Sequence, residues 1–305
     1  MKIESQNMFL MKRKQIVLKI FIFLTLAILL ERIYFLHNRG FSLSKLISKQ
    51  PSIHVSPSPE IDALLDQDFH WMDSGGTCYV FLGEDGKTIL KFFKYHQLYF
   101  KHFLYHLPFP GASDAWRIGT ILSREKKHWH KRHPSFFHSC TLVSKHLKED
   151  TGVIYLCPQP NLHFNRNIKL IDAWGIPRYF NLSQTGFALQ KKAQLLFPHL
   201  EELLKENRIE EGKRAIDSLI SLIARRCHKG IGDRDPNLRI NFGFVEGKAV
   251  EFDIGSYYSD PSLNSPFKTR RELFFTTVLL QNFLAKHSPT LLNYLLEQIA
   301  NKPLA

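Results

Sequence analysis

The stretch HKGIGDRDPNLRINFG, residues 228–243, decides how the rest of the chain is interpreted. It follows an apolar run at helical spacing, and it gathers acidic and amide side chains around a proline: Asp233, Asp235, Asn237 and Asn241. A helix-ending surface turn explains part of this pattern, because Asp, Asn, Gly and Pro all favour turns. A catalytic loop explains it as well. The remaining sequence has to discriminate between these two interpretations.

The second half of the chain, 191–305, is predicted to be mainly helical. Apolar residues recur at helical spacing over 196–223, and Gly230 is placed to end that run. Two further helices are expected at about 268–286 and 289–300. A hairpin of two short strands, 238–245 and 248–253, interrupts the helices and turns at Glu246–Gly247.

The first half, 61–190, is predicted to be rich in strands. Two of them, 78–82 and 88–93, are joined by the tight turn GEDGK. Further strands are expected at 151–157, 168–174, 177–182 and 186–190, with helices at 112–132 and 135–148. Because strands and helices are segregated along the chain, we expect an α+β fold with a β-rich N-lobe (61–190) and a mainly helical C-lobe (191–305).

The N-terminus combines basic and apolar residues. After a basic tail over 1–15, residues 16–36 are apolar except for a few positions and are as long as a bilayer core is thick, so they predict a transmembrane helix. A cleaved signal peptide and a buried helix of the folded domain are the alternatives, and no small-residue cleavage site follows Leu30. The Ser- and Pro-rich residues 37–60 are expected to form a linker.

Charge is concentrated at the same end. Residues 1–50 hold nine Lys or Arg against two Glu, which leaves +7 of the chain's net charge of +13. This favours an anionic membrane surface over nucleic acid as a partner. The cluster His128, His130 and His133 is expected to lie on a solvated basic face, and the cysteines have no metal-binding spacing.

Three separated pieces line up in a familiar order. A Gly75–Gly76 turn precedes a hairpin whose second strand contains Lys91, a helix ends in GDRDPN, and a second hairpin ends in Asp253-Ile254-Gly255. In this order they resemble the protein-kinase-like superfamily, with its glycine-rich loop, strand lysine, catalytic loop and metal-binding Asp-x-Gly. The resemblance covers about 69–260 and implies a two-lobed kinase-like fold that uses ATP and Mg²⁺.

The resemblance also implies roles for residues at the nucleotide. Gly75 and Gly76 would let the backbone approach the phosphates, and Lys91 would contact the α- and β-phosphates. Glu125 is implied as the carboxylate partner of Lys91. Asp253 would bind Mg²⁺.

In the catalytic loop, KGIGDRD resembles the family's GIxHRD with Asp233 in the place of histidine. Asp235 would then be the catalytic base, and Asn241 the second Mg²⁺ ligand. A rival register resembles the HGD loop of small-molecule phosphotransferases and makes Asp233 the base. Asn237 is the other candidate amide, and neither spacing fits the family's pattern without a change of one residue.

No activation-segment anchor follows Asp253, so the resemblance points to an abbreviated kinase that acts on a small molecule. The predicted function is a membrane-anchored phosphotransferase that moves the γ-phosphate of ATP to a hydroxyl acceptor, with its domain on the cytoplasmic face. One alternative is a catalytically inactive pseudokinase that serves as a tethered scaffold or nucleotide sensor. The other is an unrelated α+β module that binds an anionic partner.

Overall fold

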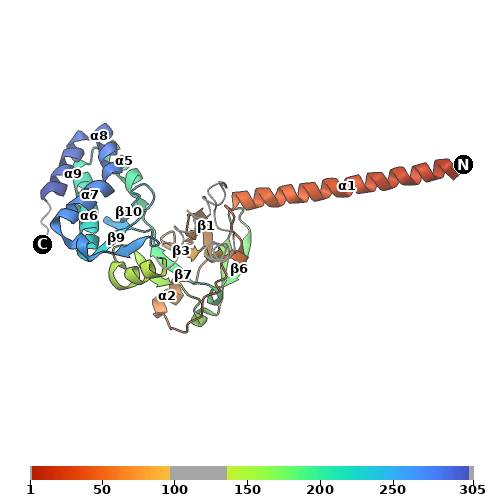
Figure 1. Ribbon diagram of the computed structural model, residues 1–305, viewed down its shortest axis with the longest axis horizontal. Coiled ribbons are helices and arrows are strands. Elements are labelled where there is room, and N and C mark those ends of the chain that lie inside the picture. The colour runs from red at the N-terminus through yellow and green to blue at the C-terminus, as the bar shows by residue number, and fades with distance from the viewer. Residues whose placement is uncertain (1, 97–135, 302–305) are drawn as a thin grey trace, which may run out of the picture.

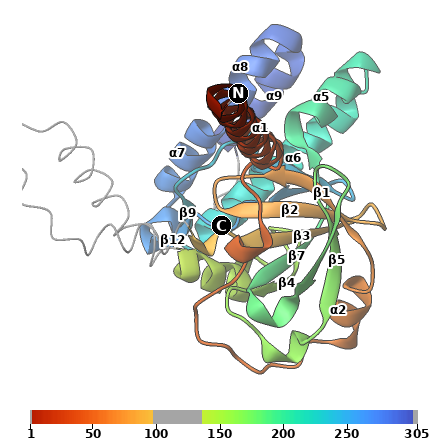
Figure 2. The same cartoon turned by 90° about the vertical axis from the view of Figure 1, so that its right-hand side faces the viewer.

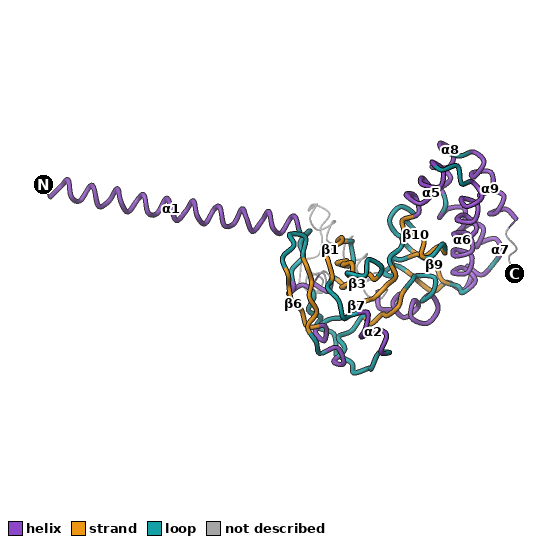
Figure 3. The backbone as a smooth tube through the Cα atoms, turned by 180° about the vertical axis from the view of Figure 1, so that it is seen from behind, coloured by secondary structure: helices purple, strands orange, loops and turns teal. Residues whose placement is uncertain are grey.

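The computed structural model describes residues 2–96 and 136–301 and has three parts in a row (Figure 1). A long helix, α1 (Lys2–His37), projects from a part made mainly of strands, and a helical part lies at the other end of the molecule. Figure 3 shows this separation of strands from helices along the long axis. The expected mixed α+β architecture, with a sheet-rich N-terminal part and a helical C-terminal part, is confirmed.

The N-terminal part is built on a seven-stranded sheet with the order β4-β7-β3-β2-β1-β5-β6. All neighbouring strands are antiparallel except β1 and β5. Several of these strands lie side by side in Figure 2. The bounds are β1 (Phe69–Ser74), β2 (Cys78–Gly83), β3 (Thr88–Phe93), β4 (Val153–Cys157), β5 (Asn167–Ile171), β6 (Pro177–Asn181) and β7 (Phe187–Lys191).

The two faces of β3 belong to different cores. Leu90 and Phe92 pack with Tyr79 into an aromatic core that also receives the short helix α2 (Pro59–Leu64). Phe93, on the opposite face, packs with Ile254 and with a helix over 136–147 whose last turn, Val143–Leu147, is π-helical. Because side chains alternate along a strand, Lys91 shares the face of Phe93.

The C-terminal part packs its helices around two small sheets. The helices are α5 (Leu196–Lys205), α6 (Ile209–His228), α7 (Pro266–Thr276), α8 (Val278–His287) and α9 (Pro289–Asn301). One small sheet has the order β11-β10-β8 and the other pairs β12 with β9. Their strands are β8 (Gln194–Leu195), β9 (Ile231–Asp233), β10 (Phe242–Val245), β11 (Lys248–Glu251) and β12 (Tyr257–Ser259).

Two predicted helical regions are each divided in the structure. The run over 196–223 breaks after α5, where Asn207 adopts a left-handed conformation with φ 55°. Asn tolerates that conformation better than most residues, so the polar stretch ENR ends one helix and begins the next. The region 268–286 breaks at Thr277, whose hydroxyl donates to the carbonyl of Leu273 at 2.8 Å.

The last turn of α1 is fastened to the sheet. The Tyr34 hydroxyl donates to Asp172 at 2.5 Å and accepts from Arg178 at 2.9 Å, and its ring stacks on Trp174 with a centroid distance of 6.1 Å. The residues that follow the helix continue into the N-terminal core, where Phe41 is buried. The end of α1 is therefore part of the folded N-terminal part.

The prediction of a transmembrane helix over 16–36 is not supported. Across the part of the chain that the structure describes, no helix has the length and apolar character needed to cross a membrane. Lys19 and the pair Glu31–Arg32 interrupt the apolar run, and the uncharged residues between them, 20–30, span about 16 Å of helix, whereas a bilayer core is about 30 Å thick.

One histidine of the helical part provides a test of its packing. His199 of α5 lies against the Phe244 ring, with centroids 4.7 Å apart, and burial lowers the pKa of His199. Protonation therefore favours the unfolded chain, so stability is complete above the ordinary histidine pKa of about 6.5 and falls as the pH drops below it.

We expect His199→Gln to lose less stability than the wild type between about pH 7 and pH 5, measured by urea unfolding. The control is His287→Gln, on the exposed surface of α8, which should keep the wild-type profile. Identical acid profiles for the wild type and His199→Gln would contradict the assignment.

Candidate functional site

The backbone of Phe252 links two of the predicted site residues. Its carbonyl accepts a hydrogen bond from the Lys91 amine at 2.8 Å, and its amide donates to the Asn241 carbonyl at 2.8 Å. Asp253 is the next residue along the chain. The Lys91 amine and the Asn241 backbone therefore meet at the residue before Asp253, although these three residues come from β3, from the residues before β10 and from the residues after β11.

The segment that leads into the loop is a strand rather than a simple helix-ending turn. Gly230, with φ 64°, ends α6 as predicted. β9 then pairs with β12 so that Asp233 lies opposite Tyr257. A side chain at Gly232 would meet the Tyr258 ring at 2.3 Å, which explains the glycine. This pairing fixes the loop against the residues that follow Asp253.

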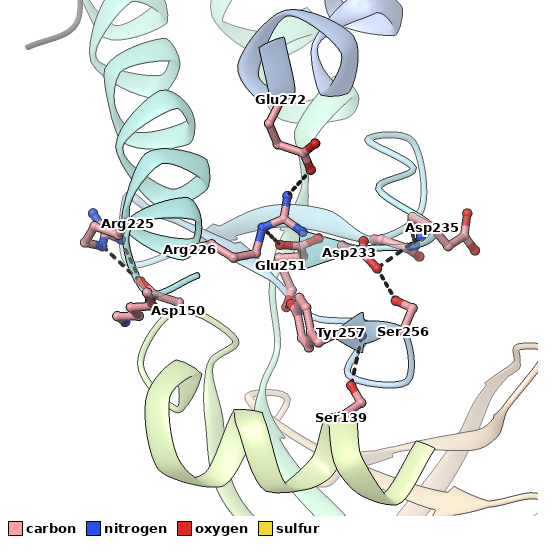
Figure 4. A network of polar contacts seen from close by, with 12 residues as sticks. Ser139, Asp150, Arg225, Arg226, Asp233, Asp235, Glu251, Ser256, Tyr257 and Glu272 are labelled. Carbon is pink, nitrogen blue, oxygen red and sulfur yellow. Dashed lines mark hydrogen bonds and ion pairs between the residues drawn. The ribbon is translucent and has the colours of Figure 1, made fainter. Parts of the chain in front are cut away.

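Asp233 and Asp235 have different surroundings. The Asp233 side chain is buried, and its Oδ1 accepts hydrogen bonds from the Ser256 hydroxyl and, at 3.0 Å, from the Asp235 amide. That second bond is the Asx turn expected of such a sequence. Asp235 is exposed, and in Figure 4 its carboxylate points away from the buried network. Asp235 therefore has the more accessible carboxylate.

The structure also separates the two candidate amides. Asn241 is buried and donates from Nδ2 to the Asp235 carbonyl at 2.8 Å, and no hydrogen bond from the described residues engages its Oδ1. Asn237 instead accepts from the Arg239 amide at 3.0 Å within the loop itself. The geometry thus pairs Asn241 with Asp235, in spite of the additional residue between them.

Burial and neighbouring charges shift the pKa values of Asp253 and Lys91. Burial raises the pKa of Asp253, while Lys91 and a hydrogen bond from the Gly255 amide at 3.2 Å lower it. The nearby charges of Asp233 and Asp235 raise it further. Burial lowers the pKa of Lys91, and Cys78 and Asp253 partly offset this effect. The site is a cluster of carboxylates that a cation would stabilise.

The donor set fits Mg²⁺ held together with a nucleotide. Asp253 and the Oδ1 atom of Asn241 are oxygen ligands, which this ion prefers. Within the described ranges, no group of three or more His, Cys, Asp or Glu side chains is arranged to hold a metal ion. A site with so few protein ligands suits an ion that takes its remaining ligands from water and substrate phosphates.

The predicted glycine turn lies beside this cluster. A Cβ at Gly255 would stand 3.5 Å from the Thr77 side chain, so the turn Gly75–Thr77 borders the loop after Asp253. Neither Gly75 nor Gly76 has a positive φ, and no atom lies within 4 Å of a Cβ built on either residue. Their approach to phosphates stays a prediction, and the space beside both glycines is open for it.

The predicted partner of Lys91 is not seen. Glu125 lies outside the described residues, as do His128, His130 and His133 and the predicted helix 112–132. Among the described residues, no carboxylate forms an ion pair with Lys91. The helix that packs beside Lys91 is the one over 136–147, and its Ser139 hydroxyl donates to the Ile254 carbonyl at 2.7 Å and accepts from the Tyr257 amide at 3.0 Å.

A buried ion-pair network lies beside the loop (Figure 4). The Arg226 guanidinium of α6 lies 3.4 Å from Glu251 of β11 and 3.1 Å from Glu272 of α7. Arg226 and Glu251 are 1% and 2% exposed. Burial and the nearby charge of Asp233 raise the pKa of Glu251, while Arg226 lowers it.

Sequence reasoning missed Arg226, Glu251 and Ser139. An arginine in the last turn of a helix has a simpler explanation, since cations suit that position. The alternation of β11, with Glu251 on the same side of the strand as Ala249, was the one signal that could have placed a carboxylate in the core.

Comparisons with known proteins identify neither a family nor a function for this chain. No family model and no curated protein matches the chain. Two solved structures of WbdD, a bifunctional kinase–methyltransferase, are similar to it at a TM-score of 0.31 and 16% identity. They cover 74% and 77% of this chain, which spans 43% and 46% of theirs. At that TM-score the function has to be argued from the site itself.

Proposed function

We propose that this protein is a kinase-like phosphotransferase that moves the γ-phosphate of MgATP to a hydroxyl group of a small acceptor. The observation that supports the proposal most is the meeting of Lys91, Asn241 and Asp253 around the Phe252 backbone, with the Asp235 carboxylate exposed beside them. Positioning and charge neutralisation supply most of the catalysis in phosphoryl transfer, and these side chains are of the types that do both.

Each side chain has a role that its surroundings suit. The Lys91 ammonium would bind the α- and β-phosphates, in exchange for its present bond to the Phe252 carbonyl. Asp253 and Asn241 would hold Mg²⁺, which neutralises phosphate charge when bound. Asp235 would accept the proton of the acceptor hydroxyl, since its carboxylate is exposed. Asp233, with its oxygen already engaged by Ser256, would position the loop.

The proposal predicts that a substitution of Asp235 impairs phosphate transfer without changing nucleotide affinity. We expect Asp235→Asn to lower kcat for phosphate transfer by about 10²-fold, because a general base typically contributes at least this much, while the Kd for MgADP stays unchanged. Release of ADP from MgATP measures the first quantity, with water as the acceptor if no better one is known, and calorimetry measures the second. A variant that keeps wild-type turnover would remove Asp235 from the chemistry.

One observation favours the catalytically inactive alternative. The Lys91 amine donates to a backbone carbonyl and forms no ion pair with a carboxylate of the described residues. Active kinases pair this lysine with a glutamate, so a site without that ion pair favours binding over catalysis. A wild-type protein that binds MgADP but transfers no phosphate would support this alternative. Absence of nucleotide binding would support the unrelated α+β module.

Attachment to a membrane and a cytoplasmic position of 61–305 stay predictions, based on the basic and apolar N-terminus. Protection of the domain from added protease in intact cells tests the position. The hydroxyl-bearing acceptor also stays a prediction, and no contact of the described residues identifies it.

A further inference from the structure

The lysine that follows β3, Lys94, holds the glycine turn. Lys94 follows the last residue of the strand, and its side chain is 8% exposed. Its amine donates to the Gly75 carbonyl at 2.5 Å and to the Ser74 hydroxyl at 2.8 Å, and it lies 4.6 Å from the centre of the Tyr79 ring. A buried ammonium group bonded to a backbone carbonyl restricts the orientation of that peptide.

Lys94 and Lys91 act on opposite sides of the sheet. They are three residues apart on an extended chain, so their side chains point to opposite faces. Lys94 lies with Tyr79 on the face of the aromatic core, whereas Lys91 lies on the face of Phe93 and the Asp253 loop. The Gly75 carbonyl is therefore drawn away from the side on which the candidate phosphate site lies.

Peptide geometry then fixes the next amide. In a trans peptide the carbonyl and the following N–H point in opposite directions, and every peptide bond among the described residues is trans. With the Gly75 carbonyl turned toward Lys94, the Gly76 N–H points toward the face of Lys91. Among the described residues the Gly76 amide donates no hydrogen bond, so it is available to a ligand.

We infer that Lys94 is a positioning residue of the nucleotide site, which turns the Gly75–Gly76 peptide so that the Gly76 N–H can donate to a phosphate oxygen. This inference rests on the proposed function. The backbone amide of a turn is a suitable donor to phosphate, and an amide that is already oriented loses little entropy on binding. Lys94 itself would not touch the nucleotide.

The support for Lys94 extends to the end of α1. The hydroxyl of Tyr79, whose ring lies beneath the Lys94 amine, donates to the Gly40 carbonyl at 3.1 Å, and Lys45 donates to the same carbonyl. Gly40 stands three residues beyond the last residue of α1. The residues that follow α1 thus hold the ring on which Lys94 lies.

The test compares a ligand that has phosphates with one that lacks them. We expect Lys94→Met to weaken the binding of MgADP to the full-length chain by about tenfold, which is the loss of one hydrogen bond to a charged group, and to leave the affinity for adenosine unchanged. Lys94→Arg, which keeps cationic donors, should recover most of the MgADP affinity. Lys87→Met, at an exposed lysine before β3, is the control and should bind both ligands as the wild type does.

A second measurement needs no variant. In the wild-type chain labelled with ¹⁵N-glycine, ADP should shift the Gly76 amide resonance strongly and adenosine should not. An unchanged Gly76 resonance, equal MgADP affinities of the wild type and Lys94→Met, or an equal loss for MgADP and adenosine would each overturn the role of Lys94 alone. A wild-type chain that binds neither MgADP nor adenosine would overturn the proposed function together with the role of Lys94.

Discussion

Asp253→Asn is expected to lower kcat/KM for phosphate transfer from MgATP by about 10³-fold, the upper end of the range for a single electrostatic contact in a catalytic site. The substitution keeps the shape of the side chain and its bond from the Gly255 amide, and removes the charge that would bind Mg²⁺. Burial raises the pKa of Asp253, so a neutral amide is well tolerated at this position. The folded chain should therefore survive while the activity is lost.

Two measurements separate this effect from unfolding. Thermal unfolding of Asp253→Asn should occur at or above the wild-type Tm, and stabilisation by MgADP should be lost while any stabilisation by metal-free ADP remains. Glu246→Gln is the matched control, because Glu246 lies at the exposed turn of the same β10–β11 hairpin and forms an ion pair with Lys191 at 3.3 Å. Equal turnover by Asp253→Asn and Glu246→Gln would exclude Asp253 as a metal ligand.

Arg226→Met is expected to cost about 3–5 kcal/mol of unfolding free energy, the range for removal of one partner from a buried ion pair. Glu251 is 2% exposed and would be left beside Asp233 without its cation. Because Asp233 lies on β9, opposite Tyr257 of β12, the same change is expected to loosen the loop that follows β9. Urea unfolding at neutral pH gives the loss directly.

A matched control lies on the same helix. Arg214 of α6 is 69% exposed and stands 4.0 Å from Glu211, so Arg214→Met should leave the midpoint of unfolding where it is in the wild type. The double variant Arg226→Met with Glu251→Leu should recover most of the lost stability, since it removes the unpaired charge together with its partner. A double variant no more stable than Arg226→Met alone would show that the ion pair is not the cause.

Local features of the fold were predictable from the sequence. The strand Thr88–Phe93 has the predicted bounds, because the tight turn before it and its apolar pattern are both short-range signals. The turn at Glu246–Gly247 and the helix end at Gly230 were predictable for the same reason, and all three residues have a positive φ. The divided helices were not, since the apolar spacing continues past Asn207 and the break depends on one residue's conformation.

The site was predictable as a set of residues rather than as a geometry. Asp235, Asn241 and Asp253 were identified from their resemblance to kinase-like motifs, but that resemblance could not show which aspartate is exposed and which is held by Ser256. That difference arises from the pairing of β9 with β12. This pairing is a contact between distant parts of the chain, so it cannot be predicted from the pattern of neighbouring residues.

Two of the supporting residues, Lys94 and Ser139, could not have been found from local patterns. Lys94 looks like a surface lysine at a strand end, and Ser139 like any helix residue, until the turn and the Asp253 loop are packed against them. The same limit applies to the N-terminal helix, where hydropathy predicted a membrane span and the charges at Lys19 and Glu31 shortened the apolar run.

The most direct test of the nucleotide site is a calorimetric titration of ADP into the wild-type chain, with and without Mg²⁺. We predict saturable binding of one ADP per chain that is tightened by Mg²⁺, and loss of that tightening when Asp253 is replaced by Asn. No heat of binding from the folded wild-type protein at millimolar ADP, in the presence of Mg²⁺, would contradict a site formed by Lys91, Asn241 and Asp253.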